Sequence, residues 1–311
     1  MRTKKVVNVR LSEELVDDIA SLSRRYGLTK SEIVRQALVM YLHLLKTANS
    51  FVVTLGPRIT PSNLAITRRD DCMFIKFPNR MILTIGYTSS GGIGPKQMDK
   101  VKTDSFTLGK MMARVALMDV LSTGSWPIAI IATLSVEMSP TGFNITRGIK
   151  SEMRKIDLDP QILCVNTEEN ISVEQTGLGI TVVGLGLEGD LRVGTTQIGD
   201  VIIAVGEPHV GEEVIEAERY HRIADLRDVI QFLQTKRVHE IIPVDTMGIL
   251  HKARFLAHSI GRQIRFYENI EFDLKKSAGP ATSILISVDR DGINGVIKEL
   301  KKPYALIGEI V

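Results

Sequence analysis

The first residues of the chain alternate between apolar and polar side chains, which is the pattern of a strand with one buried face. The alternation covers residues 4–11. Its apolar positions are Val7, Val9 and Leu11, and its polar positions are Asn8 and Arg10. A short strand is therefore expected at the N-terminus.

Two amphipathic helices are predicted directly after this strand. Ser12 is placed to cap the first helix, which carries Glu13 and Glu14 in its first turn and ends near Gly27. Residues 29–32 read Thr-Lys-Ser-Glu, which is a capping box for the second helix. Apolar residues recur at helical spacing in both. They are Leu15, Ile19 and Leu22 in the first helix, and Ile33, Val34, Ala37, Leu38 and Tyr41 in the second.

One strand and two helices are too small to enclose a core, and a lone strand leaves both of its edges unpaired. Pairing with a second copy of the chain satisfies both requirements. In their order of strand, cap, helix, capping box and helix, residues 4–45 resemble the ribbon-helix-helix family of DNA-binding proteins. An alternative that the residues leave open is a dimerisation element that binds no DNA.

The resemblance implies that two strands pair as an antiparallel ribbon in the DNA major groove. The residues facing the bases would be Lys5, Asn8 and Arg10, since arginine favours guanine and asparagine favours adenine. Lys30 and Ser31 begin the second helix and would hold a backbone phosphate there. The charge pattern agrees: residues 1–50 hold nine basic and five acidic side chains, whereas the remainder holds 30 and 31. A basic head on a near-neutral body favours an anionic partner for the head.

A short polar linker at residues 46–50 leads into a body in which strand-like and helix-like stretches alternate. The whole chain is predicted to be α+β, a β-α-α head at residues 1–46 followed by an α/β or α+β body of about 260 residues. Strands are expected at residues 52–55, 73–77, 81–85, 128–136, 162–165, 180–186, 201–206, 240–244, 264–266 and 283–288. Helices are expected at residues 105–122, 147–156, 226–235, 248–260 and 293–300.

Composition narrows the setting of the protein. With 44% hydrophobic and 24% charged residues, the chain can bury a core, which excludes wholesale disorder. No apolar run reaches the ~18–20 residues of a membrane span. Two cysteines, Cys72 and Cys164, make neither a disulfide framework nor a zinc site. A reducing cytoplasm is the expected location.

Short motifs are spread over the body. They are residues 69–73 (RDDCM), 91–96 (GGIGPK), 103–104 (TD), 118–127 (MDVLSTGSWP), 177–184 (GLGITVVG), 199–206 (GDVIIAVG), 280–288 and 305–311. In this order they resemble the superfamily of aminoimidazole ribonucleotide synthetase, thiamine-monophosphate kinase and selenophosphate synthetase, here called PurM-like. The match spans nearly the whole body.

The PurM-like resemblance implies an α/β body of two subdomains, expected at residues 51–158 and 159–311. It also implies a homodimer with a shared barrel of N-terminal strands, ATP in a cleft, and magnesium held by acidic residues. Phosphoryl transfer needs donors that cradle phosphates, cations that neutralise them, and carboxylates that hold Mg²⁺. The residues carried over are Asp71 and Asp119 as metal ligands and catalytic groups, Asn166 as a further catalytic group, and Gly92, Gly94, Lys96 and Thr167 as binders of ATP.

Three carboxylates of the superfamily pattern are missing. The first of these positions is occupied by Gly86 or Gly91, depending on the alignment, the second by Asn166, and the third by Met247. The neighbouring acids that could compensate are Asp245, Glu168 and Glu169.

Two functions therefore compete. The first is an ATP-dependent, magnesium-dependent kinase of a small metabolite, with α-ribazole or a similar riboside as the candidate substrate, that also carries a DNA-binding head. The second is a catalytically degenerate regulator of transcription, whose ribbon-helix-helix head binds an operator and whose body senses a nucleotide or metabolite. The missing carboxylates favour the second function, and the glycine loop with Asp71 and Asp119 favours the first.

Overall fold

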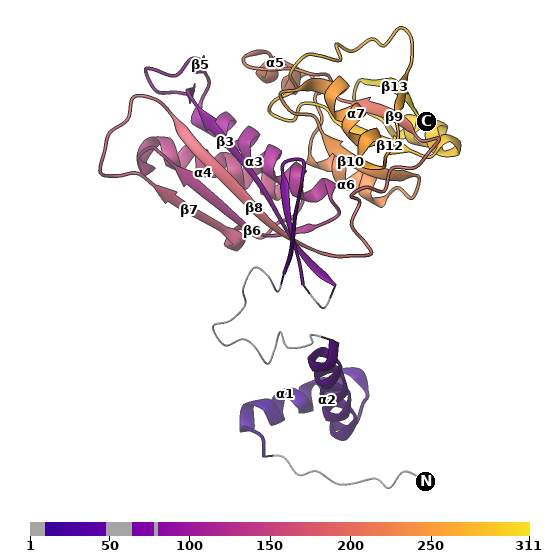
Figure 1. Ribbon diagram of the computed structural model, residues 1–311. Coiled ribbons are helices and arrows are strands. Elements are labelled where there is room, and N and C mark those ends of the chain that lie inside the picture. Colours follow the sequence, from indigo (N-terminus) through magenta and orange to yellow (C-terminus); the bar gives the residue numbers. More distant parts are fainter. Residues whose placement is uncertain (1–9, 48–63, 78–79) are drawn as a thin grey trace. The chain divides into compact units, whose positions relative to one another are not determined.

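The computed structural model describes residues 10–47, 64–77 and 80–311, excepting the side chains of residues 43–47. The chain divides into two compact units, one ending at Leu64 and one running from Ala65 to Val311 (Figure 1). We call the first unit the head and the second the body.

The head contains α1 (Glu13–Tyr26) and α2 (Lys30–Thr47), and both predicted caps are confirmed. Ser12 Oγ accepts the Leu15 N–H at 3.4 Å. Thr29 N–H donates to the Glu32 carboxylate at 2.9 Å, and Glu32 N–H donates to Thr29 Oγ1 at 3.2 Å. Most of the expected strand at residues 4–11 lies outside the described residues, including Lys5 and Asn8.

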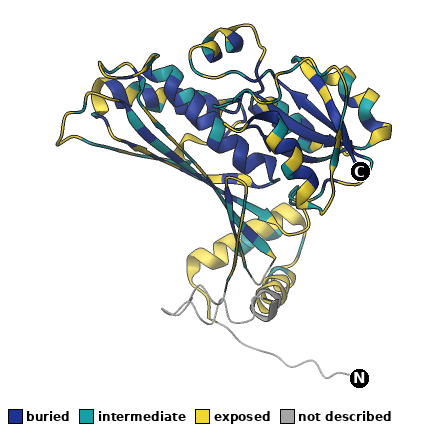
Figure 2. Ribbon diagram, turned by 45° about the horizontal axis from the view of Figure 1, so that its top comes forward, coloured by how far each residue is buried: buried dark blue, intermediate teal, exposed yellow. Residues whose placement is uncertain are grey.

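The body begins with a six-stranded sheet in the order β1-β2-β3-β8-β6-β7. Its strands are β1 (Ala65–Arg69), β2 (Cys72–Lys76), β3 (Met81–Gly91), β6 (Trp126–Leu134), β7 (Leu163–Thr167) and β8 (Gly177–Leu187). Helices α3 (Ser105–Ser122) and α4 (Phe143–Arg154) cover one face of this sheet. Side chains facing α3 and α4 are buried, and alternate side chains on the opposite face are half-buried or exposed (Figure 2). A short parallel pair, β4 (Ile93–Gly94) and β5 (Val101–Lys102), follows β3.

A second sheet of five strands has the order β10-β12-β9-β13-β11. Its strands are β9 (Val201–Val205), β10 (Val238–Pro243), β11 (Ile264–Phe266), β12 (Ile284–Val288) and β13 (Tyr304–Ile310). The helices of this part are α5 (Glu213–Arg219), α6 (Leu226–Gln234), α7 (Gly248–Ser259) and α8 (Ile293–Glu299). Strands β9 and β12 are buried at every position, because α7 packs on one face while α6, α8 and α3 share the core of the other.

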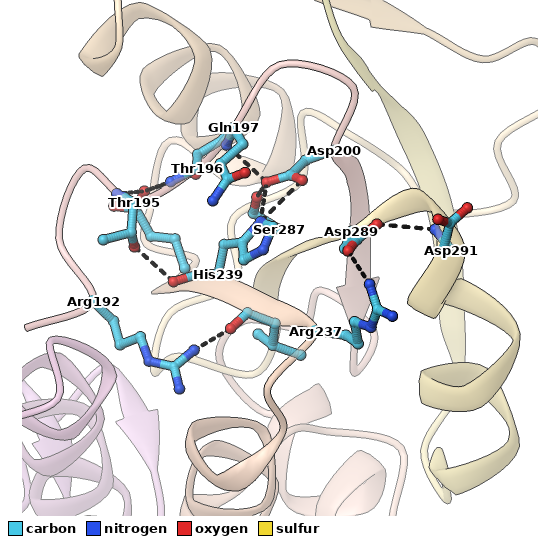
Figure 3. Close-up of polar contacts among 12 residues, drawn as sticks. Arg192, Thr195, Thr196, Gln197, Asp200, Arg237, His239, Ser287, Asp289 and Asp291 are labelled. Carbon is cyan, nitrogen blue, oxygen red and sulfur yellow. Dashed lines mark hydrogen bonds and ion pairs between the residues drawn. The ribbon is translucent and has the colours of Figure 1, made fainter. Parts of the chain in front are cut away.

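Polar contacts link the second sheet to residues 188–200, which precede its first strand β9 (Figure 3). The Asp200 carboxylate accepts hydrogen bonds from Ser287 Oγ at 2.5 Å and from the Gln197 N–H at 2.8 Å, and it contacts His239 Nδ1 at 2.8 Å. The Arg192 guanidinium donates to backbone carbonyls at the start of β10 and at the end of α6. These contacts fix the position of β10, whose C-terminal end reaches the site described below.

Most predicted body elements are observed within a few residues of their expected bounds, and α3 begins and ends where predicted. The expected strand at residues 52–55 lies outside the described residues. Strand β1 was not predicted, because four of its five positions are exposed and its sequence has little apolar alternation. The first sheet ends at Leu187 and the second begins at Val201, whereas the sequence places a subdomain boundary at residues 158 and 159.

Candidate functional site

A cleft of about 680 Å³ lies within the body. Its walls are the C-terminal end of β3, one face of α3, residues 210–215, the loop after β10, and residues 277–281 before β12. Three carboxylates line it, those of Asp71, Asp119 and Asp245, and much of the remaining wall is apolar. The predicted residues Asp71 and Asp119, 48 positions apart in the sequence, are thus brought to one cavity.

A tight hairpin turn between β1 and β2 presents Asp70 and Asp71. Asp70 has a φ of +52°, a left-handed conformation that aspartate adopts more readily than most residues. The preceding Arg69 anchors the turn: its Nη2 donates to the buried Glu240 carboxylate of β10 at 2.6 Å, and its guanidinium lies 5.5 Å from the Phe255 ring centroid on α7. The turn is therefore tied to two elements of the second sheet layer.

The Lys252 ammonium lies among these carboxylates. Its side chain is fully buried on α7. Its Nζ donates to Asp70 Oδ1, lies 2.9 Å from Asp245 Oδ2, and lies 3.7 Å from Asp71 Oδ2. We call Asp70, Asp71, Asp245 and Lys252 the Lys252 cluster.

Burial and charge set the protonation of these groups. Burial lowers the pKa of the Lys252 ammonium, but Asp70 and Asp245 outweigh burial and the pKa rises, so the ammonium stays charged. Burial also raises the pKa of the Asp70 carboxyl, in spite of Lys252. Asp119 is buried inside α3; burial, with the charges of Asp71 and Asp70, holds the pKa of its carboxyl well above the ordinary value and favours its neutral form.

The missing carboxylate at Gly86 has a steric cause. A Cβ at Gly86 would lie 2.9 Å from Val120 Cγ2 and 3.3 Å from both the Ala116 carbonyl oxygen and Asp119 Cβ. Helix α3 thus packs so closely on β3 that a side chain at Gly86 would require Val120 or the helix to shift. Gly91, by contrast, has no atom within 4 Å of a Cβ built there.

The predicted phosphate loop contributes less to the cleft than its residues suggest. Gly91 and Ile93 line the cleft, whereas Gly92, Gly94 and Lys96 are not among its described lining residues. The Lys96 ammonium instead donates to the Glu137 carboxylate at 2.6 Å, and the Lys96 N–H donates to Asp99 at 2.8 Å. A Cβ at Gly94 would lie 2.5 Å from Thr176 Oγ1, so glycine is required there by packing.

The remaining predicted body residues lie elsewhere. Asn166 and Thr167 are on β7, the edge strand of the first sheet, and neither is among the described lining residues of the cleft. Asn166 is exposed, and Thr167 Oγ1 donates to Glu169 at 2.8 Å. Met247, which replaces an acid of the superfamily pattern, is 60% exposed.

Magnesium, which the fold family implies, does not fit the Lys252 cluster as it is arranged. One oxygen each of Asp70, Asp71 and Asp245 lie within 4.8 Å of one another, as metal ligands do. Magnesium requires near-octahedral oxygen ligands at about 2.0–2.1 Å. Here the Lys252 ammonium already donates a hydrogen bond to Asp70 and forms an ion pair with Asp245 at 2.9 Å. A metal ion between them would lie in contact with a buried positive charge.

Two hydroxyl groups that line the cleft have no partner among the described residues. Ser90 Oγ and Thr103 Oγ1 are buried and make no hydrogen bond within this part of the chain, and both residues line the cleft. Buried polar atoms are nearly always paired, so such atoms at a cavity are consistent with a polar ligand.

The described DNA-facing candidates of the head are on its surface. Arg10, Lys30 and Ser31 are all exposed, and Lys30 and Ser31 form the first turn of α2. Among the described residues, no helix is long and apolar enough to cross a membrane.

The described chain thus joins a head of two helices to an α/β body of two large sheets. Residues 5–44 match the family model of the ribbon-helix-helix protein, copG family. No curated protein sequence matches the chain significantly.

The body is similar to solved structures with its predicted fold. One is HypE of E. coli, a hydrogenase maturation protein, with 15% identity, coverage of 89% of this chain and 92% of that chain, and a TM-score of 0.54. Another is thiamine-monophosphate kinase from Stenotrophomonas maltophilia, with 15% identity, coverage of 86% and 93%, and a TM-score of 0.51. A third is AaThiL complexed with AMPPCP and TMP, with 13% identity, coverage of 84% and 88%, and a TM-score of 0.52. At these identities the likeness confirms the PurM-like fold.

Sequence reasoning missed Lys252, the most buried charge of the site. A signal was present: Lys252 falls on the stripe of α7 that also carries Ile249, Ala253 and Leu256, all buried. A lysine on the apolar face of a helix needs a buried anionic partner, and such a position can be found from sequence spacing alone.

Proposed function

We propose that the protein is a DNA-binding regulator whose head binds an operator as a dimer and whose body binds a small, uncharged, hydroxyl-bearing molecule such as a riboside. The observation that carries this proposal is the chemistry of the cleft. Its described lining holds three aspartates and neither lysine nor arginine. Phosphoryl transfer needs cations around the transferred group, and this lining offers none of its own.

The proposed ligand class follows from the polar and the apolar residues that line the cleft. The carboxylates of Asp71 and Asp245 can accept hydrogen bonds from a sugar diol, and a neutral Asp119 can donate one. The other walls include Leu108, Met111 and other apolar side chains that suit a flat, apolar base. α-Ribazole and similar ribosides combine both features.

DNA binding is proposed for the head. Arg10 would contact a base edge, together with Lys5 and Asn8, while Lys30 and Ser31 at the start of α2 would hold a phosphate. The family match over residues 5–44 supports this assignment. With operator binding goes the proposal that the protein acts in the cytoplasm.

A homodimer is proposed through both units. The face of the first sheet turned away from α3 and α4 carries exposed apolar side chains on neighbouring strands. They include Ile66, Tyr87, Trp126 and Ile131, which are 40–56% exposed. A large apolar face on a sheet is typical of an interaction surface, and a second copy of this face would bury it.

The experiment selects an operator from random DNA with the full chain and then measures its affinity by fluorescence anisotropy, with and without a panel of ribosides at fixed salt. We expect a riboside to change operator affinity, and Arg10→Ala to weaken specific binding by roughly 1–3 kcal/mol and relax one base position. Lys236→Ala, which changes an exposed lysine of the body, is the control. Selection of no DNA sequence, or unchanged affinity in Arg10→Ala, would refute the assignment of the head.

A kinase remains the second candidate, because Asp71, Asp119 and Asp245 converge on one cleft of a PurM-like fold. In that case ATP would be the phosphate donor, Asp71 and Asp119 would hold Mg²⁺ after Lys252 moved away, and Asn166, Thr167, Gly92, Gly94 and Lys96 would have to approach the cleft. This candidate predicts riboside-dependent release of ADP that is lost in Asp71→Asn.

A further inference from the structure

The Lys252 cluster has the ligand set of a divalent-metal site with a lysine ammonium inside it. The ammonium is fully buried, and burying an unpaired charge is costly, so Lys252 can stay there only because the carboxylates neutralise it. The dependence is mutual, because three carboxylates within 4.8 Å of one another repel unless a cation lies between them.

We propose that Lys252 is a built-in cation that takes the place of a divalent metal in this cluster, so that the cleft is organised without magnesium. The ammonium carries three N–H donors; it donates to Asp70 Oδ1, and its Nζ lies 2.9 Å from Asp245 Oδ2 and 3.7 Å from Asp71 Oδ2. A lysine is part of the chain, so the arrangement of the carboxylates does not depend on the concentration of free metal.

Two parts of the Lys252 cluster, the hairpin turn and Lys252 itself, are held in place by contacts outside the cluster. The hairpin turn of Asp70 and Asp71 is anchored by Arg69 on Glu240, and Lys252 is fixed by the packing of α7 on the second sheet. The position of Lys252 among the carboxylates therefore does not depend on the binding or loss of a metal ion. This inference rests on the proposed function only in taking the cleft as the ligand site.

The test measures thermal unfolding of the full chain in EDTA and in increasing Mg²⁺ or Mn²⁺ at constant ionic strength, without DNA or riboside. The variants are Lys252→Met and, as a control, Lys110→Met, which removes a lysine paired with Glu218 outside the cluster. We expect the wild type and the control to show no saturable change with metal. Lys252→Met should unfold at lower temperature in EDTA and recover in a saturable way as Mg²⁺ fills the vacated position.

A saturable rise of the wild type's unfolding temperature with metal that disappears in Asp245→Asn would overturn the proposal. A folded Lys252→Met whose unfolding temperature does not change with Mg²⁺ or Mn²⁺ would also overturn it. If Lys252→Met folds only with metal, the proposal is supported. If it folds in neither condition, Lys252→Met/Asp70→Asn decides: recovered folding supports a charge-compensating role, and continued failure overturns it. None of these readouts involves DNA, so failure here is distinguishable from failure of the regulator.

Discussion

Replacing Gly86 by alanine tests whether the carboxylate missing at this position is excluded by packing. The added Cβ would lie 2.9 Å from Val120 Cγ2 and 3.3 Å from the Ala116 carbonyl oxygen, closer than ordinary van der Waals contact. Overpacking of this kind costs typically about 1–3 kcal/mol. Alanine in a strand is otherwise favoured over glycine by roughly 0.5–1 kcal/mol. We therefore expect Gly86→Ala to lower the free energy of unfolding by about 1–2 kcal/mol.

The matched control is Gly91→Ala on the same strand, where a Cβ meets no atom within 4 Å. Its free energy of unfolding should be unchanged or raised by up to about 1 kcal/mol. Urea unfolding followed by circular dichroism gives both values, and an unchanged m-value shows that only stability has changed. Equal midpoints for the two variants would refute the steric explanation. A clear deficit at Gly86 alone would show that the packing of α3 on β3 disfavours a side chain at this position.

Two further predictions concern buried charges away from the cleft. Arg114 and Glu152 form an ion pair in which both side chains are at most 1% exposed. In urea unfolding, Arg114→Met should therefore lower the free energy of unfolding by about 3–5 kcal/mol. Arg237→Met, which breaks the more exposed pair with Asp289, should lower it by less than about 1 kcal/mol. Burial raises the pKa of Asp228 from 3.8 to about 6, so the contribution of its neutral form to stability is complete below pH 3.8 and is lost as the pH rises through 6. Asp228→Asn should remove this pH dependence and stabilise the protein at pH 8 by about 2–3 kcal/mol. Parallel profiles of stability against pH for the variant and the wild type would contradict the raised pKa.

The sequence predicted helix ends correctly where neighbouring side chains determine them. The caps at Ser12 and Thr29 and the bounds of α3 follow from side chains that act within a few residues of themselves. Asp71 and Asp119 were assigned to one site through the PurM-like resemblance, and the cleft contains both.

The partners of the charged residues could not be predicted in the same way. Lys96 contacts Glu137, 41 residues away, and Lys252 contacts Asp70, 182 residues away. Such pairs are determined by how the sheets and helices pack in three dimensions, and they cannot be predicted from the spacing of residues along the chain. The position of Asn166 on an edge strand likewise depends on the strand order, which places β7 beside β6 rather than near the cleft.

A body that only binds its small molecule transfers no phosphate to it. ADP release by the full chain with saturating Mg²⁺ and ATP, in the presence of each riboside that changes operator affinity, tests this property. ADP should be released at the rate of a buffer control, both by the wild type and by Asp71→Asn. Riboside-dependent release of ADP that falls to the control rate in Asp71→Asn would refute the regulator without catalysis and establish the kinase.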